Sequence, residues 1–259
     1  MPDAQTLPLL LRQLRLPTMA ACWAQLESRA QLENWSLAQT LAALCEHELA
    51  ERERRRLARH LKEARLPPGK TLERFEFDAL AAEQRRQLSA LAGHTQWVEQ
   101  AHNLLLFGPS GVGKSHVAAG LGHALIDQGY RVRYASASSL VQELQAAKQS
   151  LRLGDALIKL DKYAVLVIDD IGYVKRSEAE TSVLFELIAH RYESASLIIT
   201  ANQPFSAWDS IFPDSMMAVA AIDRLVHHAT LMELGGESYR KRAYQRQLQG
   251  QGGKTSSSE

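Results

Sequence analysis

This sequence has few cysteines, no long apolar run and almost no net charge. Its 259 residues include only two cysteines, Cys22 and Cys45, with no CxxC spacing and no histidine cluster of the kind that binds zinc. We expect both to be buried thiols, because a free cysteine packs as a small hydrophobe. A zinc-centred fold is therefore not expected.

The sequence also lacks the segments that direct a chain to a membrane. No apolar run reaches the ~18 residues that cross a bilayer. The N-terminal segment MPDAQTLPLLLRQLRLP has no basic region ahead of its apolar stretch and no small-residue cleavage site, which argues against a secretory signal. We therefore expect a cytoplasmic protein with no membrane partner.

The net charge of +1 gives no overall electrostatic reason to bind nucleic acid, so such binding would depend on local patches.

The N-terminal quarter of the chain is predicted to be helical. Between residues 5 and about 66, Leu and Ala recur at helical spacing and no run alternates like a strand, which predicts about three helices. The segment PPGK at 67–70 breaks this pattern and predicts a linker. We expect a helical domain at 1–68, a second domain at 69–248, and a disordered Gly- and Ser-rich tail at 249–259.

The second domain alternates β-branched apolar runs with longer helical stretches, which is typical of βαβ units and a parallel sheet. The predicted strands are 103–108, 131–136, 164–169, 196–201 and 230–234. The predicted helices are 114–128, 138–160 with a break at Gly154, and 178–193. The expected fold class is α/β, a three-layer αβα core around a mostly parallel five-stranded sheet.

Residues 108–115 have the sequence GPSGVGKS, the pattern of a P-loop between a strand and a helix. Its glycines permit a tight loop whose backbone N–H groups point at phosphate oxygens. Lys114 would reach the β and γ phosphates, Ser115 would bind Mg²⁺, and the helix adds its positive dipole end. The motif predicts ATP and Mg²⁺ as ligands. The expected nucleotide contacts are Gly108, Pro109, Ser110, Gly111, Val112, Gly113, Lys114, Ser115 and His116.

Two carboxylates end the apolar run VLVIDD at 165–170. Asp169, at the carboxyl end of the strand, is suited to bind Mg²⁺, and Asp170 to orient or deprotonate the attacking water. The alternative is a buried strand that merely meets a polar loop. Asn202, which ends the strand SLIITA, could hydrogen-bond the γ-phosphate and the attacking water, or simply open the turn before Pro204.

Several longer segments resemble the IstB-like transposition helper ATPases, relatives of DnaC-like helicase loaders in the AAA+ superfamily. They are GPSGVGKSH, VLVIDDIGY at 165–173, LFELIAHRYE at 184–193, IITANQPFSAWD at 198–209, AAIDRLVHH at 220–228 and GESYRKR at 236–242, with the lead-in KTLERFEF at 70–77. The resemblance covers nearly the whole chain. It implies a P-loop NTPase of the AAA+ type in a bacterial cytoplasm.

The resemblance also implies two arginine roles. Arg224 resembles the arginine finger that acts on ATP held by a neighbouring copy, which implies a homo-oligomer, and Arg240 resembles the second sensor of the same chain. Either could instead be an ordinary surface residue, Arg224 beside Asp223. In the wider superfamily the position of Asp170 is usually Glu, so hydrolysis is expected to be slow or to need a partner.

A basic stripe lies in the predicted helical domain. Arg52, Arg55, Arg59 and Lys62 recur every three or four residues within ERERRRLARHLKEAR at 51–65. The stripe could follow a phosphate backbone, but a solvated helix face with i,i+4 ion pairs would have the same pattern. The resemblance favours contact with double-stranded DNA.

The leading prediction is a DNA-binding ATPase that assembles on DNA and directs or stimulates a cognate transposase. The nearest alternative is a helicase loader, which would use the same ATPase motifs. A small-molecule kinase is a further alternative, although no lid-like insertion interrupts the strands. A nucleotide-gated interaction module with little hydrolysis is the last.

Overall fold

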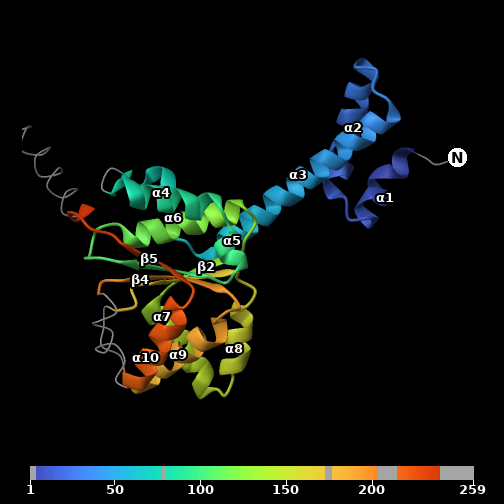
Figure 1. Cartoon of the computed structure of the whole chain (residues 1–259). Coiled ribbons are helices and arrows are strands. Elements are labelled where there is room, and N and C mark those ends of the chain that lie inside the picture. The colour runs from blue at the N-terminus through green and yellow to red at the C-terminus, as the bar shows by residue number, and fades with distance from the viewer. Residues whose placement is uncertain (1–3, 78–79, 173–176, 204–214, 240–259) are drawn as a thin grey trace, which may run out of the picture. The chain divides into compact units, whose positions relative to one another are not determined.

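The computed structural model describes residues 4–77, 80–172, 177–203 and 215–239 (Figure 1). The chain divides into two compact units, residues 1–59 and residues 60–259. This division falls inside helix α3 (Leu37–Ala64). The domain boundary near residue 68 stays a prediction, and the predicted tail at 249–259 lies outside the described residues.

The first unit contains a 3-10 turn, η1 (Ala4–Thr6), then α1 (Leu7–Gln13), α2 (Pro17–Leu32) and most of α3. Glu48 of α3 joins α3 to the start of α2. Its Oε2 accepts hydrogen bonds from the backbone N–H groups of Thr18 (2.8 Å) and Met19 (3.1 Å). These N–H groups have no acceptor within their own helix, so the carboxylate caps α2.

Neither cysteine is buried, so that expectation was wrong. Cys22 is half-buried on α2 and Cys45 is exposed on α3. The helices of this unit bury few side chains among the described residues, with only Leu26 and Ala30 buried on α2. The unit therefore does not contain enough core to enclose both thiols.

The second unit is built on five strands in the order β2-β3-β4-β1-β5. They are β1 (Asn103–Phe107), β2 (Val132–Ser136), β3 (Val165–Asp169), β4 (Ser196–Ala201) and β5 (Ala229–Glu233). Every pairing in this sheet is parallel. β1 and β4 are buried along their whole length, as a parallel sheet covered on both faces requires.

Helices cover both faces of this sheet, which confirms the three-layer α/β prediction (Figure 1). α4 (Ala82–Gly93) and α6 (Lys114–Asp127) lie on one face. α7 (Ala137–Gln149), α8 (Leu153–Leu160), α9 (Glu178–Arg191) and α10 (Ser215–Val226) lie on the other. A 3-10 turn, η2 (Leu72–Arg74), packs on α6, and the short α5 (Gln96–Glu99) precedes β1. No described helix is long and apolar enough to cross a membrane.

The break in the helical segment after β2 falls earlier than predicted. The chain leaves the helix at Ser150–Arg152, where Leu151 has a left-handed φ of 57°, and Gly154 lies inside α8. α8 buries Leu153, Leu157 and Leu160 on one face, so apolar burial sets its start. A glycine within a helix costs only about 1 kcal/mol, which this burial offsets.

Arg191, the last residue of α9, is 1% exposed and ties together the amino ends of two strands. Its guanidinium donates to the carbonyls of Tyr163 (3.0 Å) and Ser196 (3.1 Å). Burial lowers the pKa of Arg191 to about 10, and the charge of Asp161 opposes this shift. The turn between α9 and β4 is thus fixed from inside the protein.

Candidate functional site

The loop after β1 has the backbone conformation predicted for a phosphate cradle. Gly108, Gly111 and Gly113 have φ values of 137°, 89° and 104°, a region that side chains rarely permit. A Cβ at Gly108 would lie 2.0 Å from the Leu234 carbonyl oxygen. Glycine is therefore required at 108 both for conformation and for space.

Lys114 begins α6 and points back into the loop, with only 6% of its surface exposed. Its Nζ donates to the carbonyl oxygens of Gly108 (2.7 Å) and Pro109 (2.8 Å) and to Asn202 Oδ1 (2.7 Å). A buried ammonium is stable only when its donors are paired. These neutral oxygens hold the cation at the mouth of the cradle, where phosphate oxygens could take their place.

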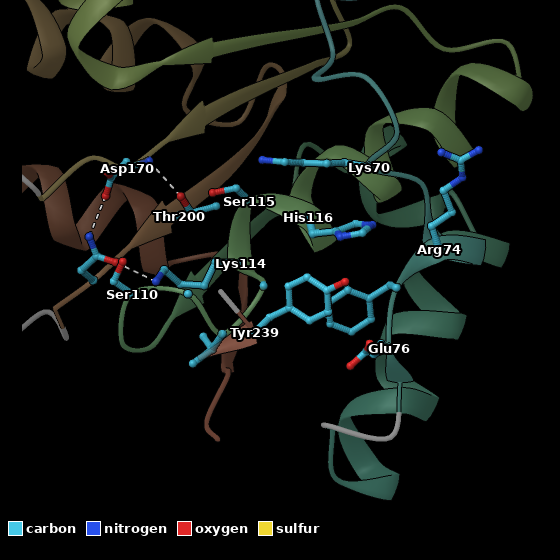
Figure 2. Close-up of a pocket in the computed structure, with 15 residues that line it drawn as sticks. Lys70, Arg74, Glu76, Ser110, Lys114, Ser115, His116, Asp170, Thr200 and Tyr239 are labelled. Carbon is cyan, nitrogen blue, oxygen red and sulfur yellow. Dashed lines mark hydrogen bonds between the residues drawn. The ribbon is translucent and has the colours of Figure 1, made fainter. Parts of the chain in front are cut away.

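A hydrogen-bonded chain links Lys114 to both predicted carboxylates. Asn202 Nδ2 donates to Asp170 Oδ1 (2.7 Å), and the Asp170 backbone N–H donates to Thr200 Oγ1 (2.8 Å). Thr200 in turn donates to Asp169 Oδ1 (2.6 Å). The dashed lines in Figure 2 follow this chain from Lys114 to Thr200. Parallel strands in the order β3-β4-β1 bring these residues together, because each lies at or just beyond a carboxyl end.

Asp170 has a left-handed φ of 66°, a conformation that Asp tolerates better than most side chains. The Thr200 hydroxyl and the Asn202 amide both hold it there. Such backbone strain persists where the surroundings determine it, and it is common at functional sites. The turn presents the Asp170 carboxylate to the Asn202 amide, which itself accepts from Lys114.

The phenol of Tyr134, on β2, donates to Asp169 Oδ2. Burial raises the pKa of Tyr134, and the hydrogen bond to Asp169 raises it further. The phenol therefore stays protonated and remains a donor. Asp169 is held from two sides, by the hydroxyls of Tyr134 and Thr200.

Asp170 and Thr200 line a pocket of about 410 Å³ (Figure 2), whereas Asp169 and Tyr134 are not among the described residues that line it. The predicted residues Ser110, Gly111, Val112, Gly113, Lys114, Ser115, His116, Asp170 and Asn202 line it. The opposite wall is the segment before the sheet, including Lys70, Arg74, Phe75 and Glu76, together with Tyr239. A pocket of this volume is large enough for a nucleotide.

The lead-in segment is fixed against α6 by His116. The His116 Nε2 lies 2.8 Å from the Thr71 carbonyl oxygen, and its ring packs edge-on against Phe75 at 5.3 Å between centroids. Phe75 also covers Gly113, where an added Cβ would lie 2.7 Å from its ring. An aromatic ring beside the phosphate loop could pack on the base of a nucleotide.

The donor set suits a magnesium nucleotide. Ser115 and Asp169 offer hydroxyl and carboxylate oxygens, the ligands that Mg²⁺ prefers. The loop and the first turn of α6 offer backbone N–H groups for phosphate oxygens. The described residues therefore fit both ligands.

Arg224 does not line this pocket. It lies near the end of α10, donates to the Ala220 carbonyl (2.8 Å) and packs over the Phe185 ring at 5.2 Å. Arg240, the other predicted arginine, lies outside the described residues. Within one chain, Arg224 is therefore not among the described residues that line the pocket.

The basic stripe is exposed along α3, but half of it is engaged. Arg52 pairs with Glu48 and Arg55 with Glu51, both at i,i+4 spacing. Arg59 and Lys62 are exposed, and within the described part of the chain they make no ion pair or hydrogen bond. Half of the stripe thus has the i,i+4 ion pairs of a solvated helix face, and its contact with DNA stays a prediction.

Two residues of the hydrogen-bonded network, Thr200 and Tyr134, were missed from the sequence, as were the pocket residues Lys70, Arg74, Phe75, Glu76 and Tyr239. Thr200 stands two positions before Asn202 near the end of the strand SLIITA, so strand alternation places both side chains on one face. Tyr134 is on a neighbouring strand, in register with Val167 of β3. Alternation could have found Thr200, but Tyr134 depends on the order of the strands.

Comparison with known proteins finds relatives along nearly the whole chain. The family model described as "IstB-like ATP binding protein" matches residues 9–247. A relative from Sinorhizobium fredii, named as an insertion-sequence ATP-binding protein, is 52% identical over 93% of this chain and 81% of its own length. A Pseudomonas aeruginosa relative, named as an ATP-binding protein of insertion sequence IS21, is 38% identical over 90% of this chain and 88% of its own.

Solved structures support the fold alone. DnaI aligns with a TM-score of 0.52 at 21% identity, over 65% of this chain and 89% of its own. Aquifex aeolicus DnaA aligns with a TM-score of 0.53 at 20% identity, over 72% of this chain and 56% of its own. The second unit thus has the αβα P-loop fold of these proteins, and the chain belongs to the IstB-like ATP-binding protein family.

Proposed function

We propose that this protein is a Mg²⁺-dependent ATPase that assembles with copies of itself on double-stranded DNA and directs a cognate transposase. The observation that carries the ATPase proposal is the chain of hydrogen bonds from Lys114 through Asn202 and Asp170 to Thr200 and Asp169. It gathers a cation, an amide and two carboxylates at one end of the phosphate loop. A pocket that only bound nucleotide would need no second carboxylate at this point.

The residues have separate roles in hydrolysis. The loop N–H groups bind the phosphates and Lys114 balances the charge that develops on them. Ser115 and Asp169 hold Mg²⁺, which neutralises charge on the phosphate oxygens. Asp170 orients the attacking water and accepts its proton, while Asn202 positions that water relative to the γ-phosphate. Arg240 acts as a sensor of the γ-phosphate, as the family resemblance implies.

Self-assembly is proposed from the position of Arg224. Its guanidinium lies over Phe185 and outside the pocket of its own chain. A planar, permanently charged group can stabilise phosphoryl charge when it is supplied by another copy. Arg224→Ala is expected to lower turnover by about 10³-fold or more while single chains still bind ATP. Arg86→Ala, which removes an exposed arginine paired with Glu83 on α4, is the matched control.

DNA contact is proposed for the basic stripe of Arg52, Arg55, Arg59 and Lys62 on α3. Arg59 and Lys62 are exposed and make no described ion pair, so they can meet phosphates without first breaking a bond. Each phosphate contact that is lost reduces the salt dependence of binding by about one unit of slope. The transposase partner is proposed because the relatives are named for insertion sequences.

One experiment tests assembly and hydrolysis together, and a separate assay with the transposase or a replicative helicase tests the partner. Particle mass is measured by light scattering with double-stranded DNA, Mg²⁺ and ATP, each also omitted in turn, and phosphate release is followed in the same samples. We expect a large particle only when all three are present, and faster hydrolysis in that particle. A single-chain particle under every condition would contradict assembly. Stimulation of a replicative helicase, with none of the transposase, would support a helicase loader instead.

A further inference from the structure

The edge of the sheet opposite the ATP pocket gathers residues that the ATPase mechanism does not use. β4, β1 and β5 are neighbours and parallel, so the segments that enter them meet at one edge. Glu193 precedes β4, His102 precedes β1, and His227 and His228 precede β5. Residue spacing did not predict this cluster, because its members come from three segments that only the strand order brings together.

Three of these side chains converge on one point. The Glu193 Oε1 lies 3.7 Å from His228 Nε2 and 3.8 Å from His227 Nδ1. One ligand atom from each of the three residues lies within 4.8 Å of the others. Zinc bonds of 2.0–2.2 Å in a tetrahedron place neighbouring ligand atoms about 3.4 Å apart. The two measured separations exceed this by only a few tenths of an ångström.

The backbone holds these residues in place from within the fold. The Asn103 N–H donates to the His228 carbonyl oxygen (2.7 Å), and the His228 ring stacks on His102 at 5.2 Å with 6° between the planes. Glu193 has a left-handed φ of 56°, two residues after the buried Arg191. A non-glycine residue in this conformation is uncommon, and here it turns the carboxylate toward the histidines.

We propose that Glu193, His227 and His228 form a binding site for a late first-row divalent cation such as Zn²⁺. Two imidazoles and one carboxylate suit zinc, nickel or copper better than Mg²⁺, which prefers an all-oxygen shell. A fourth position stays open to water, because the site is exposed on its outer side. The site lies at the opposite edge of the sheet from the ATP pocket, so it can be tested independently of the proposed ATPase activity.

The Tyr192 hydroxyl competes with metal binding, because it contacts both His227 and Glu193. The Tyr192 hydroxyl and His227 Nδ1 are hydrogen-bonded at 2.6 Å. A ligand nitrogen must present its lone pair to the ion, so coordination through Nδ1 replaces this hydrogen bond. Tyr192→Phe is therefore expected to bind zinc at least as tightly as the parent. Weaker binding by Tyr192→Phe would assign His227 to a hydrogen-bond network and overturn the three-residue site.

The direct test is zinc titration of the untagged full chain by calorimetry, in excess Mg²⁺ and without nucleotide. Cys22→Ser and Cys45→Ser are built into every protein, so that no thiolate binds the ion. We expect one Zn²⁺ per chain, and Glu193→Gln and His228→Gln each to weaken binding by about tenfold or more. His47→Gln, which removes an exposed histidine of α3, should bind as the parent does.

Thermal unfolding of the same proteins separates loss of the site from loss of the fold. Bound zinc should raise the Tm of the parent and of His47→Gln, and not that of Glu193→Gln. Without zinc, Glu193→Gln should melt close to the parent, because its side chain is exposed. Absence of stoichiometric binding, or equal zinc affinity in all the proteins, would overturn the proposal.

Discussion

Asn202 Nδ2 donates a hydrogen bond to Asp170 Oδ1 over 2.7 Å, while the Oδ1 of the same amide accepts from Lys114. One neutral side chain therefore stands between the cation and the carboxylate of the site and fixes the rotamers of both. The amide could exchange either bond for a phosphate oxygen or a water. This arrangement couples the presence of nucleotide to the orientation of Asp170.

The first prediction concerns Asp170 as the base. Asp170→Asn keeps the size of the side chain but removes its ability to accept a proton. We expect ATP binding to persist and turnover to fall by about 10²-fold or more, the usual contribution of a general base. Phosphate release and nucleotide binding are measured on the same protein. Asp155→Asn, on the exposed start of α8, is the control, and unchanged turnover in Asp170→Asn would favour a nucleotide-gated module without catalysis.

The second prediction isolates the hydroxyl of Thr200. This group accepts from the Asp170 N–H and donates to Asp169, and the residue is only 1% exposed. Thr200→Val removes both bonds at nearly constant volume and is expected to cost about 1–3 kcal/mol of unfolding free energy. It should also lower turnover at least about tenfold, because both carboxylates lose their support.

Thr181→Val gives the matched control for Thr200. Thr181 is equally buried, its hydroxyl donates to the carbonyls of Ser177 and Glu178 in the first turn of α9, and it does not line the pocket. It should lower stability and leave turnover per folded molecule unchanged. A comparable loss of turnover in both variants would show that Thr200 acts only through the fold.

Much of this fold followed from local sequence because local chemistry determined it. The glycines of the loop, Lys114 at the helix start and the apolar run before Asp169 each have one favourable structure, and the strands begin and end within a residue of expectation. Contacts between residues far apart in the sequence were harder to predict. Tyr134 reaches Asp169 only because β2 lies beside β3, and the Glu193 cluster exists only because β4, β1 and β5 are neighbours.

Burial was also misjudged where it depended on packing rather than residue type. Cys45 has the apolar character of a core residue, but α3 presents it to solvent. The sequence predicted a helix break at Gly154, whereas α8 already begins at Leu153, whose side chain is buried. In both cases tertiary contacts outweighed an intrinsic preference that is small in energy.

The third prediction concerns Mg²⁺ and Tyr134. The phenol orients Asp169 by donating to its Oδ2, and its raised pKa keeps it protonated throughout the neutral range. Tyr134→Phe retains the ring and removes this support. The Mg²⁺ concentration for half-maximal turnover is expected to rise about tenfold or more, as when other partners of metal ligands are removed. Tyr130→Phe, whose hydroxyl bonds the exposed Glu99, should leave that concentration unchanged.

The fourth prediction uses two glycines with different surroundings. Gly113 has a φ of 104° and would place a Cβ 2.7 Å from the Phe75 ring, whereas nothing lies within 4 Å of a Cβ at Gly93. Gly113→Ala should therefore weaken ATP binding sharply by distorting the loop. Gly93→Ala should bind ATP as the parent does. Equal affinities, measured with a fluorescent ATP analogue, would show that the loop tolerates the change.

The fifth prediction concerns Glu48, whose carboxylate caps α2 and pairs with Arg52. Burial alone would raise the pKa of Glu48, but hydrogen bonds from Arg52, Met19 and Thr18 lower it overall from 4.5. Because the folded pKa is depressed, the stabilisation is present above pH 4.5 and is lost as the pH falls through the folded pKa. Glu48→Gln mimics that loss at neutral pH.

We expect Glu48→Gln to lower the free energy of local opening around α2 by about 1–2 kcal/mol, a factor of roughly 5–30 in amide exchange. Hydrogen exchange of peptides from 17–32 measures this, and the ratio of variant to parent rates cancels the effect of pH on intrinsic exchange. The ratio should shrink toward one as the pH falls below 4.5. A ratio that stays constant with pH would show that the charge of Glu48 is not what stabilises α2.

The same contact affects the test of the basic stripe. Since Arg52 pairs with Glu48, loss of DNA binding in Arg52→Ala would have two causes, and Arg59→Ala gives the cleaner test of the basic stripe.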